Sequence, residues 1–407
     1  MRIVHIHKYF HSRDGASRYE RGLMRLQEEA GHAVAPFAMH DERNEPTPWS
    51  QYFVSNLDTK HVGFGMGAVK QLGRAVWSVE AKKNFGRLLD VFKPDVVHAH
   101  NLYTHLSPSP LAAAKERGIP VVMTVHDYAL VSANYVLWNK TKPMAVSHLG
   151  SFDTIKTKFI KNSTIATAML EMVLRMHRFT KAYDMTVNRF VTCSSFVRDM
   201  MILGGFSPKK ISVISPFAEP LIDPRKSIHH DVKENFVLFA GRLEAYKGPQ
   251  VLIEAVKHLP PETAIKIAGV GPEEEKLKAM VPKGAKIEFL GFVPGNELWR
   301  TMRRARMVVV PSVWYEPFGL VALEAMCQGT PVVVAKSGGL PEIVGESAAG
   351  FVVAPNDPKG LAKAILKLLE DDDLVGVMGE AAGRRAREIG DPQEHLAKIM
   401  EVYSRCG

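Results

Sequence analysis

Two glutamates eight residues apart, Glu316 and Glu324, stand in the stretch VVVPSVWYEPFGLVALEAMCQGTPVV, the part of the chain richest in chemical information. Pro317 favours the start of a helix and keeps the residue before it extended, so one carboxylate is expected in a turn and the other in the helix. The alternative is structural. In that case Glu316 only stabilises the helix end and Glu324 is solvated, as charged side chains usually are.

The start of this helix also offers backbone donors. If it begins near Phe318, the N–H groups of Phe318, Gly319 and Leu320 form a positive helix N-terminus, which suits an anionic or hydroxyl-rich ligand. Gly319 would let such a ligand approach the backbone closely.

Two cations, Arg242 and Lys247, flank a tight loop (AGRLEAYKG) that follows an expected strand and ends at Gly248 before a helix. Placed beside a helix N-terminus, they can converge on one pair of phosphates. Taken alone, an Arg and a Lys in such a loop more often face solvent. The chain contains no G-x-x-x-x-G-K-[ST], and no G-x-G-x-x-G follows its first expected strand, which disfavours P-loop and NAD-dependent enzymes.

Histidines end the expected strands of the first half: His7 and His11 after the first, His98 and His100 in DVVHAH, and His126 in TVHDY. A metal site is conceivable, because His5 with His7 and His98 with His100 each share one face of a strand. The absence of acidic or Cys partners in these motifs favours hydrogen bonding to a ligand or to neighbours, so no metal site is predicted.

The elements that must position these residues alternate along the chain. Short β-branched runs between helical patterns predict parallel sheets covered by helices on both faces. In the first half we expect strands at Met1–Ile6, Asp95–Ala99 and Val121–Val125, and helices at Tyr19–Glu29 and Ser109–Arg117. In the second half we expect the helix Pro249–His258 and strands at Phe236–Ala240, Ala264–Ala268, Lys286–Leu290, Met307–Val310 and Pro331–Ala335.

The 407 residues exceed one usual domain, and the α/β pattern restarts after Ser215–Val232, a polar, proline-interrupted stretch that we take as the hinge. We therefore predict an α/β fold with two Rossmann-like, doubly wound domains, residues 1–215 and 216–390. They are expected to face each other across a cleft, because such sheets bind ligands outside the carboxyl ends of their strands. Residues 391–407 are expected to form a helix that crosses back to the first domain.

The net charge of +9 permits nucleic acid, an anionic membrane or phosphorylated ligands as partners. The excess is local: residues 1–215 hold 28 Lys and Arg against 17 Asp and Glu, whereas the rest of the chain is close to neutral. Between Lys140 and Lys210, basic residues alternate with apolar ones such as Met172 and Phe179. This pattern fits an interfacial helix on anionic lipid, and it fits equally a core helix with a solvated basic face.

The three cysteines are far apart, and no run reaches the roughly 18 apolar residues of a membrane span. The start of the chain does not read as a signal peptide. We therefore expect a cytoplasmic protein that could be peripheral at the inner face of the membrane.

In this combination and order, the motifs resemble those of the family-four retaining glycosyltransferases, which have the two-domain GT-B fold and use a nucleotide-sugar donor. The resemblance covers nearly the whole chain and is strongest over Phe236–Gly350. It is carried by GRL..YKG, IAGVGPEEEKL, FLGFVP, the E-x7-E stretch and SGGLPEIV in the second half, and by DVVHAHN, TVHDY, CSSFVRDMM and GFSPKKISVI in the first.

The resemblance implies a role for each of the charged candidates. Arg242 and Lys247 would hold the donor diphosphate and stabilise the charge that develops as it leaves. Glu316 would bind the hydroxyls of the donor sugar, and Glu324 those of the ribose. The amides of Phe318, Gly319 and Leu320 would lie behind the sugar.

The same resemblance places the other candidates around the donor. Gly269, Gly271 and the Phe292 and Val293 turn would border the base, His126 would face the donor sugar and the acceptor, and Gly15 would lie under the phosphates. It also implies transfer with retention, without a metal or other cofactor. The donor would carry UDP or GDP, and the acceptor would be a glycan or lipid-linked sugar of cell-surface polysaccharide or glycolipid synthesis.

Two alternatives share these features. A nucleotide-sugar 2-epimerase can have the same two-domain architecture, although the E-x7-E setting favours transfer. A catalytically silent sugar-binding protein would not need every donor-site position filled. A nucleic-acid binder is disfavoured, because the basic segment has few interleaved aromatic residues.

Overall fold

The computed structural model describes residues 1–12, 14–56, 66–139, 142–144, 153–160, 162–218 and 233–406. These form two compact units. The first contains Met1–Leu137, Ala145–Ile214 and Gln393–Gly407, and the second contains Trp138–Met144 and Ser215–Pro392. Of the expected hinge, residues 219–232 lie outside the described residues.

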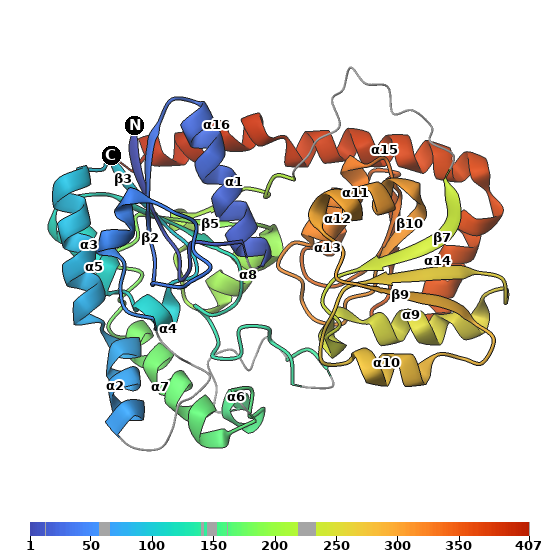
Figure 1. Cartoon of the computed structure of the whole chain (residues 1–407), viewed down its shortest axis with the longest axis horizontal. Helices are drawn as coiled ribbons and strands as arrows, with labels where there is room; N and C mark the ends of the chain where they lie inside the picture. The colour runs from blue at the N-terminus through green and yellow to red at the C-terminus, as the bar shows by residue number, and fades with distance from the viewer. Residues whose placement is uncertain are drawn as a thin grey trace. The chain divides into compact units, whose positions relative to one another are not determined.

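The first unit is built on a parallel sheet with the strand order β2-β1-β3-β4-β5-β6 (Figure 1). Its strands are β1 (Arg2–Ile6), β2 (Ala33–Phe37), β3 (Val96–Ala99), β4 (Val121–Val125), β5 (Arg189–Thr192) and β6 (Ile211–Val213). All residues of β3 and β4 are buried, as expected for β-branched runs covered on both faces.

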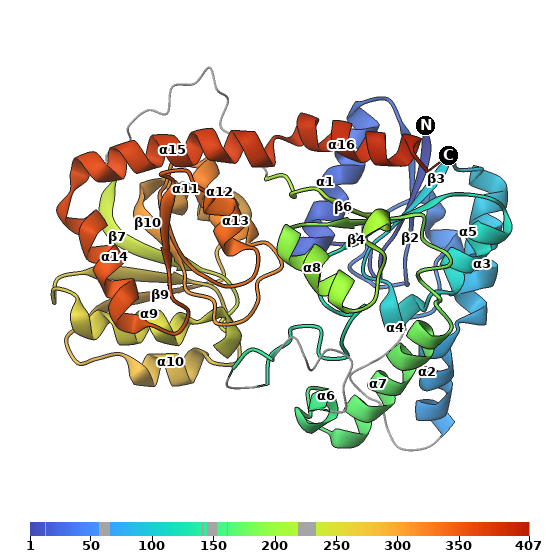
Figure 2. The same ribbon diagram turned by 180° about the vertical axis from the view of Figure 1, so that it is seen from behind.

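Helices cover both faces of this sheet, with α3 and α5 on one face and α1 on the other (Figures 1 and 2). The helices are α1 (Gly15–Glu29), α2 (Met66–Val76), α3 (Val79–Phe92), α4 (Tyr103–Leu106), α5 (Ser109–Glu116), α6 (Asp153–Lys156), α7 (Thr164–Phe179), α8 (Ser195–Leu203) and α16 (Pro392–Ser404). Short 3-10 turns span Pro48–Tyr52 and Pro208–Lys210.

The second unit repeats the architecture with the strand order β12-β11-β10-β7-β8-β9, again parallel throughout. Its strands are β7 (Glu234–Ala240), β8 (Ala264–Ala268), β9 (Lys286–Gly291), β10 (Ala305–Val310), β11 (Val332–Ala335) and β12 (Gly350–Val353). The central strand β10 is buried at all six positions, whereas the residues of the edge strand β9 are exposed or half-buried.

In this unit α9 and α10 cover one face of the sheet, and α11 and α12 cover the other (Figures 1 and 2). The helices are α9 (Pro249–Ala255), α10 (Glu274–Met280), α11 (Gly295–Arg304), α12 (Leu320–Cys327), α13 (Leu340–Val344), α14 (Pro358–Glu370) and α15 (Asp372–Gly390). Short 3-10 turns span Ala245–Lys247 and Val256–His258. Both units are thus doubly wound α/β sheets, which confirms the predicted fold class.

Each sheet has one point where the direction of strand addition reverses. In the second unit the chain runs outward from β7 through β8 to β9 on one side, and from β10 through β11 to β12 on the other. In the first unit the reversal lies between β1 and β3. Doubly wound sheets bind ligands at this point, beyond the carboxyl ends of the strands. The loops that follow β7 and β10 contain Arg242, Lys247 and Glu316.

Two helix starts differ from the sequence prediction. The first helix begins at Gly15, four residues before the expected Tyr19, because Asp14 and Ser17 form a capping box at its N-terminus. The helix α12 begins at Leu320 and not near Phe318. Gly319 is its N-cap with φ of +118°, a left-handed conformation in which a side chain would be strained.

Within the described part of the chain, no helix combines the length and apolar character needed to span a membrane.

Candidate active site

A buried carboxylate and a lysine join the two loops at the reversal point of the second unit. The ammonium of Lys247, after β7, lies 2.7 Å from Oε1 of Glu316, after β10. The hydroxyl of Ser312 donates to the same oxygen, also at 2.7 Å. Glu316 is 5% exposed, so the carboxylate of this charge-assisted pair is shielded from solvent. None of the described residues bonds the other oxygen, Oε2, in the structure, which leaves it able to accept from a ligand hydroxyl.

The Lys247 loop is held by aromatic and backbone contacts. The ammonium lies 4.9 Å from the centre of the Trp314 ring, and Tyr246 packs edge-on against that ring at 5.1 Å. The N–H of Val313 donates to the carbonyl of Tyr246 at 3.0 Å. At Gly248, with φ of +77°, a Cβ would stand 2.0 Å from the Pro311 carbonyl oxygen. Only glycine therefore lets the two loops approach this closely.

Arg242 does not share the partner of Lys247. Its guanidinium pairs with Glu244 at 2.7 Å, and its side chain is 69% exposed. The alternative of a solvent-facing arginine therefore describes Arg242 in this structure, whereas Lys247, with a side chain 26% exposed, is partly enclosed. Release of Arg242 from an exposed pair costs little, because such pairs are worth about 1 kcal/mol or less.

The two glutamates occupy the turn and the helix as expected. The backbone of Glu316 is fixed by the N–H of Gly339, which donates to its carbonyl at 2.7 Å. Glu324 lies on α12 and is 5% exposed, so the alternative in which it is solvated is wrong. Burial, with Glu324 as a neighbouring charge, raises the pKa of Cys327 to about 12.

The N-terminus of α12 offers fewer donors than expected. Because the helix begins at Leu320, the amides of Leu320 and Val321 have no carbonyl one turn earlier to bind. Phe318 is buried, at 5% exposure, and precedes the N-cap Gly319. The predicted donors Gly319 and Leu320 are therefore at the helix start, and Phe318 lies outside it.

The expected base-binding residues lie in adjacent loops after β8 and β9. The N–H of Gly269 donates to the carbonyl of Gly291 at 2.7 Å, directly before the turn formed by Phe292 and Val293. At Gly271 a Cβ would stand 2.3 Å from the carbonyl oxygen of Leu243. Phe292 is 75% exposed, which makes its ring accessible to a planar ligand.

In the first unit, Gly15 is the first residue of α1 and His126 follows β4 directly. The side chain of Asp14 caps α1 and accepts from the N–H of Ser17 at 3.0 Å. A phosphate over Gly15 would therefore meet a carboxylate, which Lys8, 3.9 Å from Asp14, offsets in part. The role of Gly15 under the donor phosphates stays a prediction.

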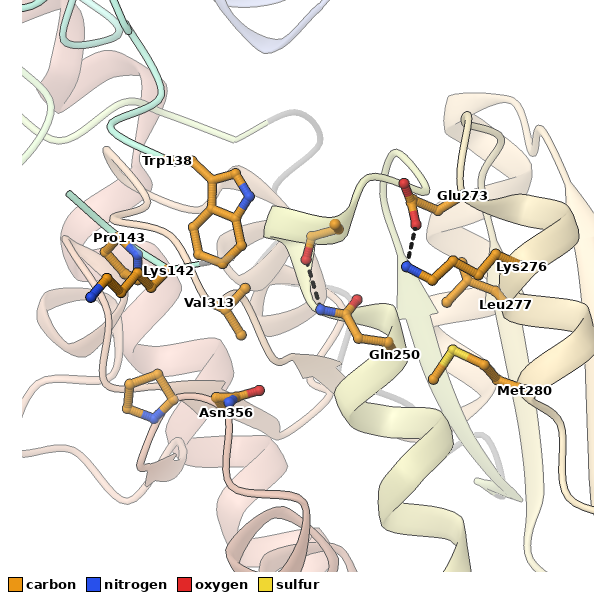
Figure 3. Close-up of a pocket in the computed structure, with 12 residues that line it drawn as sticks. Trp138, Lys142, Pro143, Gln250, Glu273, Lys276, Leu277, Met280, Val313 and Asn356 are labelled. Atoms are coloured by element: carbon orange, nitrogen blue, oxygen red, sulfur yellow. Dashed lines mark hydrogen bonds and ion pairs between the residues drawn. The ribbon is translucent and has the colours of Figure 1, made fainter. Parts of the chain in front are cut away.

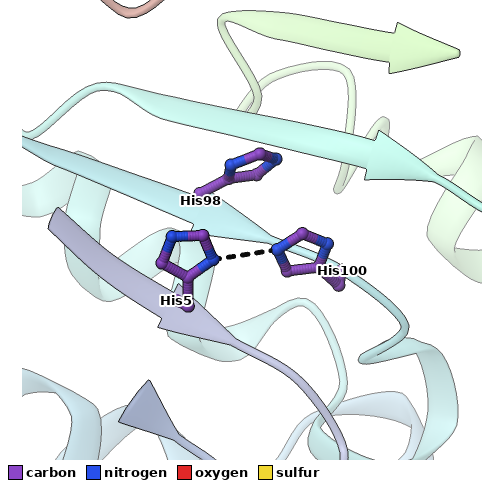
Figure 4. Close-up of side chains that lie close together, drawn as sticks. All are labelled: His5, His98 and His100. Carbon is purple, nitrogen blue, oxygen red and sulfur yellow. Dashed lines mark hydrogen bonds between the residues drawn. The ribbon is translucent and has the colours of Figure 1, made fainter. Parts of the chain in front are cut away.

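Buried histidines form a cluster on one face of the first sheet. Figure 4 shows His5 and His100 joined by a hydrogen bond, with His98 beside them. The side chains of His5 and His98 are neighbours because β1 and β3 pair at these two residues. Burial lowers the pKa of His5 to about 4 and holds the pKa values of His98 and His100 well below their usual range.

These three histidines are also the residues that could hold a metal ion, with ring nitrogens within 4.8 Å of one another. However, each of their six ring nitrogens already lies within hydrogen-bonding distance of a partner: His5 with His100 and Gln27, His98 with Tyr403 and Thr124, and His100 with His5 and His126. A metal would have to displace several of these bonds. The donor set fits hydrogen bonding better than metal binding.

Sequence reasoning missed a pocket of about 340 Å³ in the second unit. Figure 3 shows Trp138 and Asn356 on one side of it and Gln250 and the Glu273–Lys276 ion pair on the other. Trp138 belongs to Trp138–Met144, the short segment that separates from the surrounding first-unit sequence. No motif marks this segment, because the other residues that line the pocket, from Ala245 to Asn356, lie more than a hundred positions further along the chain.

Other contributors were also missed because they lack a distinctive spacing. Ser312 holds Glu316, and Gln27 and Tyr403 bond the histidine cluster. A serine four residues before a glutamate, or a glutamine in the middle of a helix, is common in any sequence.

Comparison with known proteins shows the family to which the chain belongs. The model of Glycosyltransferase Family 4 matches residues 13–220, and that of the group 1 glycosyl transferases matches residues 223–385. An uncharacterized glycosyltransferase of Methanocaldococcus jannaschii is 31% identical over 298 residues, which cover 72% of this chain and 70% of that protein. D-inositol 3-phosphate glycosyltransferase of Corynebacterium glutamicum is 36% identical over 213 residues, 47% of this chain and 51% of that protein.

The fold is shared with solved structures at lower identity. The crystal structure of Anabaena HepE in complex with UDP and glucose superposes with a TM-score of 0.64 at 18% identity, covering 99% of both chains. The chain therefore belongs to glycosyltransferase family 4. It is a glycosyltransferase with the GT-B fold, as the motifs indicated.

Proposed function

We propose that this glycosyltransferase transfers a sugar, with retention and without a metal, from a nucleotide-diphosphate donor to a glycan or lipid-linked acceptor. The observation that carries the proposal is the buried Glu316, with one oxygen held by Lys247 and Ser312 and the other bonded by no residue in the described part of the chain. A fixed carboxylate with one available oxygen is suited to orient the hydroxyls of a sugar. The adjoining ammonium is suited to the negative charge of a leaving diphosphate.

In the proposed reaction, the acceptor hydroxyl oxygen forms a bond to the anomeric carbon on the face from which the diphosphate departs. The bond between this carbon and the phosphate oxygen breaks, and its electron pair stays on the diphosphate. The freed phosphate oxygen takes the proton of the acceptor hydroxyl. Lys247 and Arg242 supply the positive charge that the leaving group needs, and Glu316 holds the sugar.

The nucleotide is proposed to be UDP or GDP. HepE was solved with UDP and glucose, which supports a UDP-sugar as the first donor to test. The base would stack on the exposed ring of Phe292, between the turn at Val293 and the glycines Gly269 and Gly271, and the ribose would be held by Glu324.

A panel of UDP-, GDP- and ADP-sugars scored by thermal shift tests the donor, because a bound ligand raises the unfolding temperature. The preferred donor is then incubated with and without glycan acceptors, and the anomeric configuration of the product is determined. Transfer with retention that persists in EDTA supports the proposal. An inverted product, or activity lost in EDTA and restored only by a divalent ion, contradicts it. If the donor sugar is epimerised when no acceptor is present, the alternative function as a nucleotide-sugar 2-epimerase is favoured.

The surface of α7 supports an acceptor at a membrane. Its buried side carries Glu171, which pairs with Arg175 at 3.0 Å and Arg178 at 3.4 Å. Its other side exposes apolar residues at helical spacing: Ile165 (60%), Met172 (51%), Met176 (38%) and Phe179 (90%). The core-helix alternative expected a solvated basic face, and the helix does carry partly exposed arginines, Arg175 (side chain 40% exposed) and Arg178 (25%), beside this apolar stripe. Lys161, part of the same basic segment, lies outside the described residues.

We propose that this apolar stripe, with nearby cations such as Lys156 and Lys158, rests on anionic lipid. Sedimentation with anionic and neutral vesicles tests it, using Phe179→Ser and, as a control, Val377→Ser, another exposed apolar residue on α15 in the second unit. Stronger sedimentation with anionic vesicles that only Phe179→Ser reduces supports the proposal. Equal sedimentation with both vesicles contradicts it.

A further inference from the structure

A chain of hydrogen bonds runs from His126 into the interior of the first unit. Nε2 of His126 lies 3.1 Å from Nδ1 of His100, and Nε2 of His100 lies 3.0 Å from Nδ1 of His5. Nε2 of His5 then lies 2.8 Å from Oε1 of Gln27 on α1. His5, His100 and Gln27 are fully buried, whereas His126 is half-buried. The chain therefore connects a residue of the candidate site to the core.

Counting protons shows which atom donates and which accepts in each of these hydrogen bonds. Three neutral imidazoles carry three ring protons. The carbonyl oxygen of Gln27 can only accept, so Nε2 of His5 carries the first proton. Nδ1 of His5 must then accept from Nε2 of His100, and Nδ1 of His100 must accept from Nε2 of His126. All three protons are used, and Nδ1 of His126 is left with a lone pair.

The rings are neutral because they are buried together. Burial lowers the pKa values of His5 and His126 to about 4, and it holds the pKa of His100 well below its usual range. Two charged groups near His126 act in opposite senses on its pKa: Asp14 raises it and Lys8 lowers it. At pH 7 the counting therefore applies without an additional proton.

The far end of the chain is anchored by α16. Nε2 of Gln27 donates to the hydroxyl of Tyr403 at 3.0 Å, which orients the glutamine amide with its oxygen toward His5. The hydroxyl of Tyr403 in turn lies 2.6 Å from Nδ1 of His98, whose Nε2 lies 2.7 Å from Oγ1 of Thr124. With the amide in this orientation, Tyr403 donates to His98 and His98 donates to Thr124. Each hydrogen bond then has one donor and one acceptor.

We propose that Gln27, held by Tyr403, is a positioning residue that fixes His126 in the Nε2–H tautomer and so presents Nδ1 as a hydrogen-bond acceptor to a bound sugar or acceptor hydroxyl. The part concerning the sugar rests on the proposed function. The tautomer itself does not. Nδ1 of His126 would accept a hydrogen bond from a hydroxyl group and would not donate one, and this determines which orientation of the hydroxyl it favours.

The tautomer is measured directly by NMR of the full chain labelled with ¹⁵N-histidine, at pH 7 and without donor. The chemical shifts of the ring nitrogens distinguish protonated from bare nitrogens, and His126→Gln assigns the signal by its loss. We expect a proton on Nε2 of His126 in the parent protein. A proton on Nδ1 would overturn the proposal.

Two variants test the anchor. Gln27→Met removes the acceptor at similar size, and Tyr403→Phe removes only the hydroxyl that orients Gln27. Both are expected to convert His126 into a mixture of tautomers. The matched control is Tyr19→Phe, which also deletes a hydroxyl that links α1 to α16, through His395 at 2.9 Å. This hydroxyl also interacts with Thr124 beside His98, but its removal leaves the side chains of Gln27 and Tyr403 in place. His126 should keep its tautomer in this control.

A single Nε2–H tautomer retained in both Gln27→Met and Tyr403→Phe would overturn the proposal, as would an equal loss in Tyr19→Phe. If Gln27→Met fails to fold, Tyr403→Phe and its control carry the test. Because no donor is present, these outcomes are independent of the proposed transfer reaction. Failure of the donor panel with the expected tautomers intact would count against the proposed function alone.

Discussion

The two units share one architecture and hold polar groups at the reversal point of their sheets in opposite ways. The first unit buries neutral imidazoles, which are joined in a directional chain ending at Gln27. The second unit holds a charged pair, Lys247 with Glu316, in which the lysine side chain remains 26% exposed. The difference shows that the same sheet can supply either a fixed hydrogen-bond direction or a fixed charge, depending on what its strand-end loops carry.

Removing the ammonium group of Lys247 from the second unit should have the largest effect on turnover. We expect Lys247→Ala to lower turnover roughly 10²–10³-fold, because a preorganised group that stabilises the leaving diphosphate contributes that much. Steady-state transfer with the preferred donor measures it. The control is Lys363→Ala, an exposed lysine of α14, which should be near normal. Near-normal transfer by Lys247→Ala would show that charge is not the contribution of the second unit.

The next largest effect is expected from acid, which should destabilise the first unit more than the second. The folded pKa values of His5 and His126, about 4, lie below the unfolded value of 6.5, so the unfolded chain binds more protons between these pH values. Stability is therefore lost as pH falls from about 6.5 toward 4. At pH 5 each of these histidines should cost the first unit about 2 kcal/mol of its free energy of unfolding. His7, His98 and His100, also lowered by burial, act in the same sense.

Two buried carboxyls of the first unit oppose this loss, since burial raises the pKa of Asp127 to about 6 and that of Glu20 to about 8. Five histidines outnumber them, so the net change is a loss. In the second unit the groups with raised pKa values, Lys278 and Cys327, titrate far above pH 7. Hydrogen exchange at pH 7 and pH 5, corrected for intrinsic rates, should show protection lost mainly in the first unit. An equal loss of protection in both units would contradict the expected difference in their response to acid.

A smaller effect is expected from a substitution at Gly248, where the Lys247 loop contacts the loop after β10. In Gly248→Ala the new Cβ would clash with the Pro311 carbonyl, so we expect the free energy of unfolding to fall by roughly 1–3 kcal/mol. Gly284→Ala is the matched control, because it has a similar positive φ (+85°) and no atom within 4 Å of its Cβ. Denaturant unfolding of both variants isolates the contact. Equal losses would mean that backbone strain alone accounts for the effect.

The smallest effect should come from the exposed cation. We expect Arg242→Ala to lower turnover about tenfold, less than Lys247→Ala, because an exposed charge is screened by solvent and salt. If the bound donor draws Arg242 away from Glu244, the losses of turnover in Arg242→Ala and Lys247→Ala should become more alike. An effect of Arg242→Ala larger than that of Lys247→Ala would reverse the assignment of the main phosphate contact.

The sequence predicted the strand and helix alternation well, because each buried parallel strand is a short β-branched run that can be read locally. It also predicted that Glu316 lies in a turn and Glu324 in a helix. It was wrong about the start of α12, since Pro317 indicates a helix start nearby but the left-handed Gly319 ends the turn two residues later. It listed no strands for β2, β5, β6 and β12, which are three to five residues long and carry weak patterns.

By itself, the sequence determined the fold class and the family, because those depend on hydrophobic periodicity and on motifs that occur in a fixed order. The tertiary structure decided which groups meet. Lys247 pairs with Glu316 because β7 and β10 are neighbours in the sheet, and Tyr403 reaches His98 and Gln27 because α16 packs on the first unit. Such contacts follow from strand order and helix packing, which bring together residues that no local pattern connects.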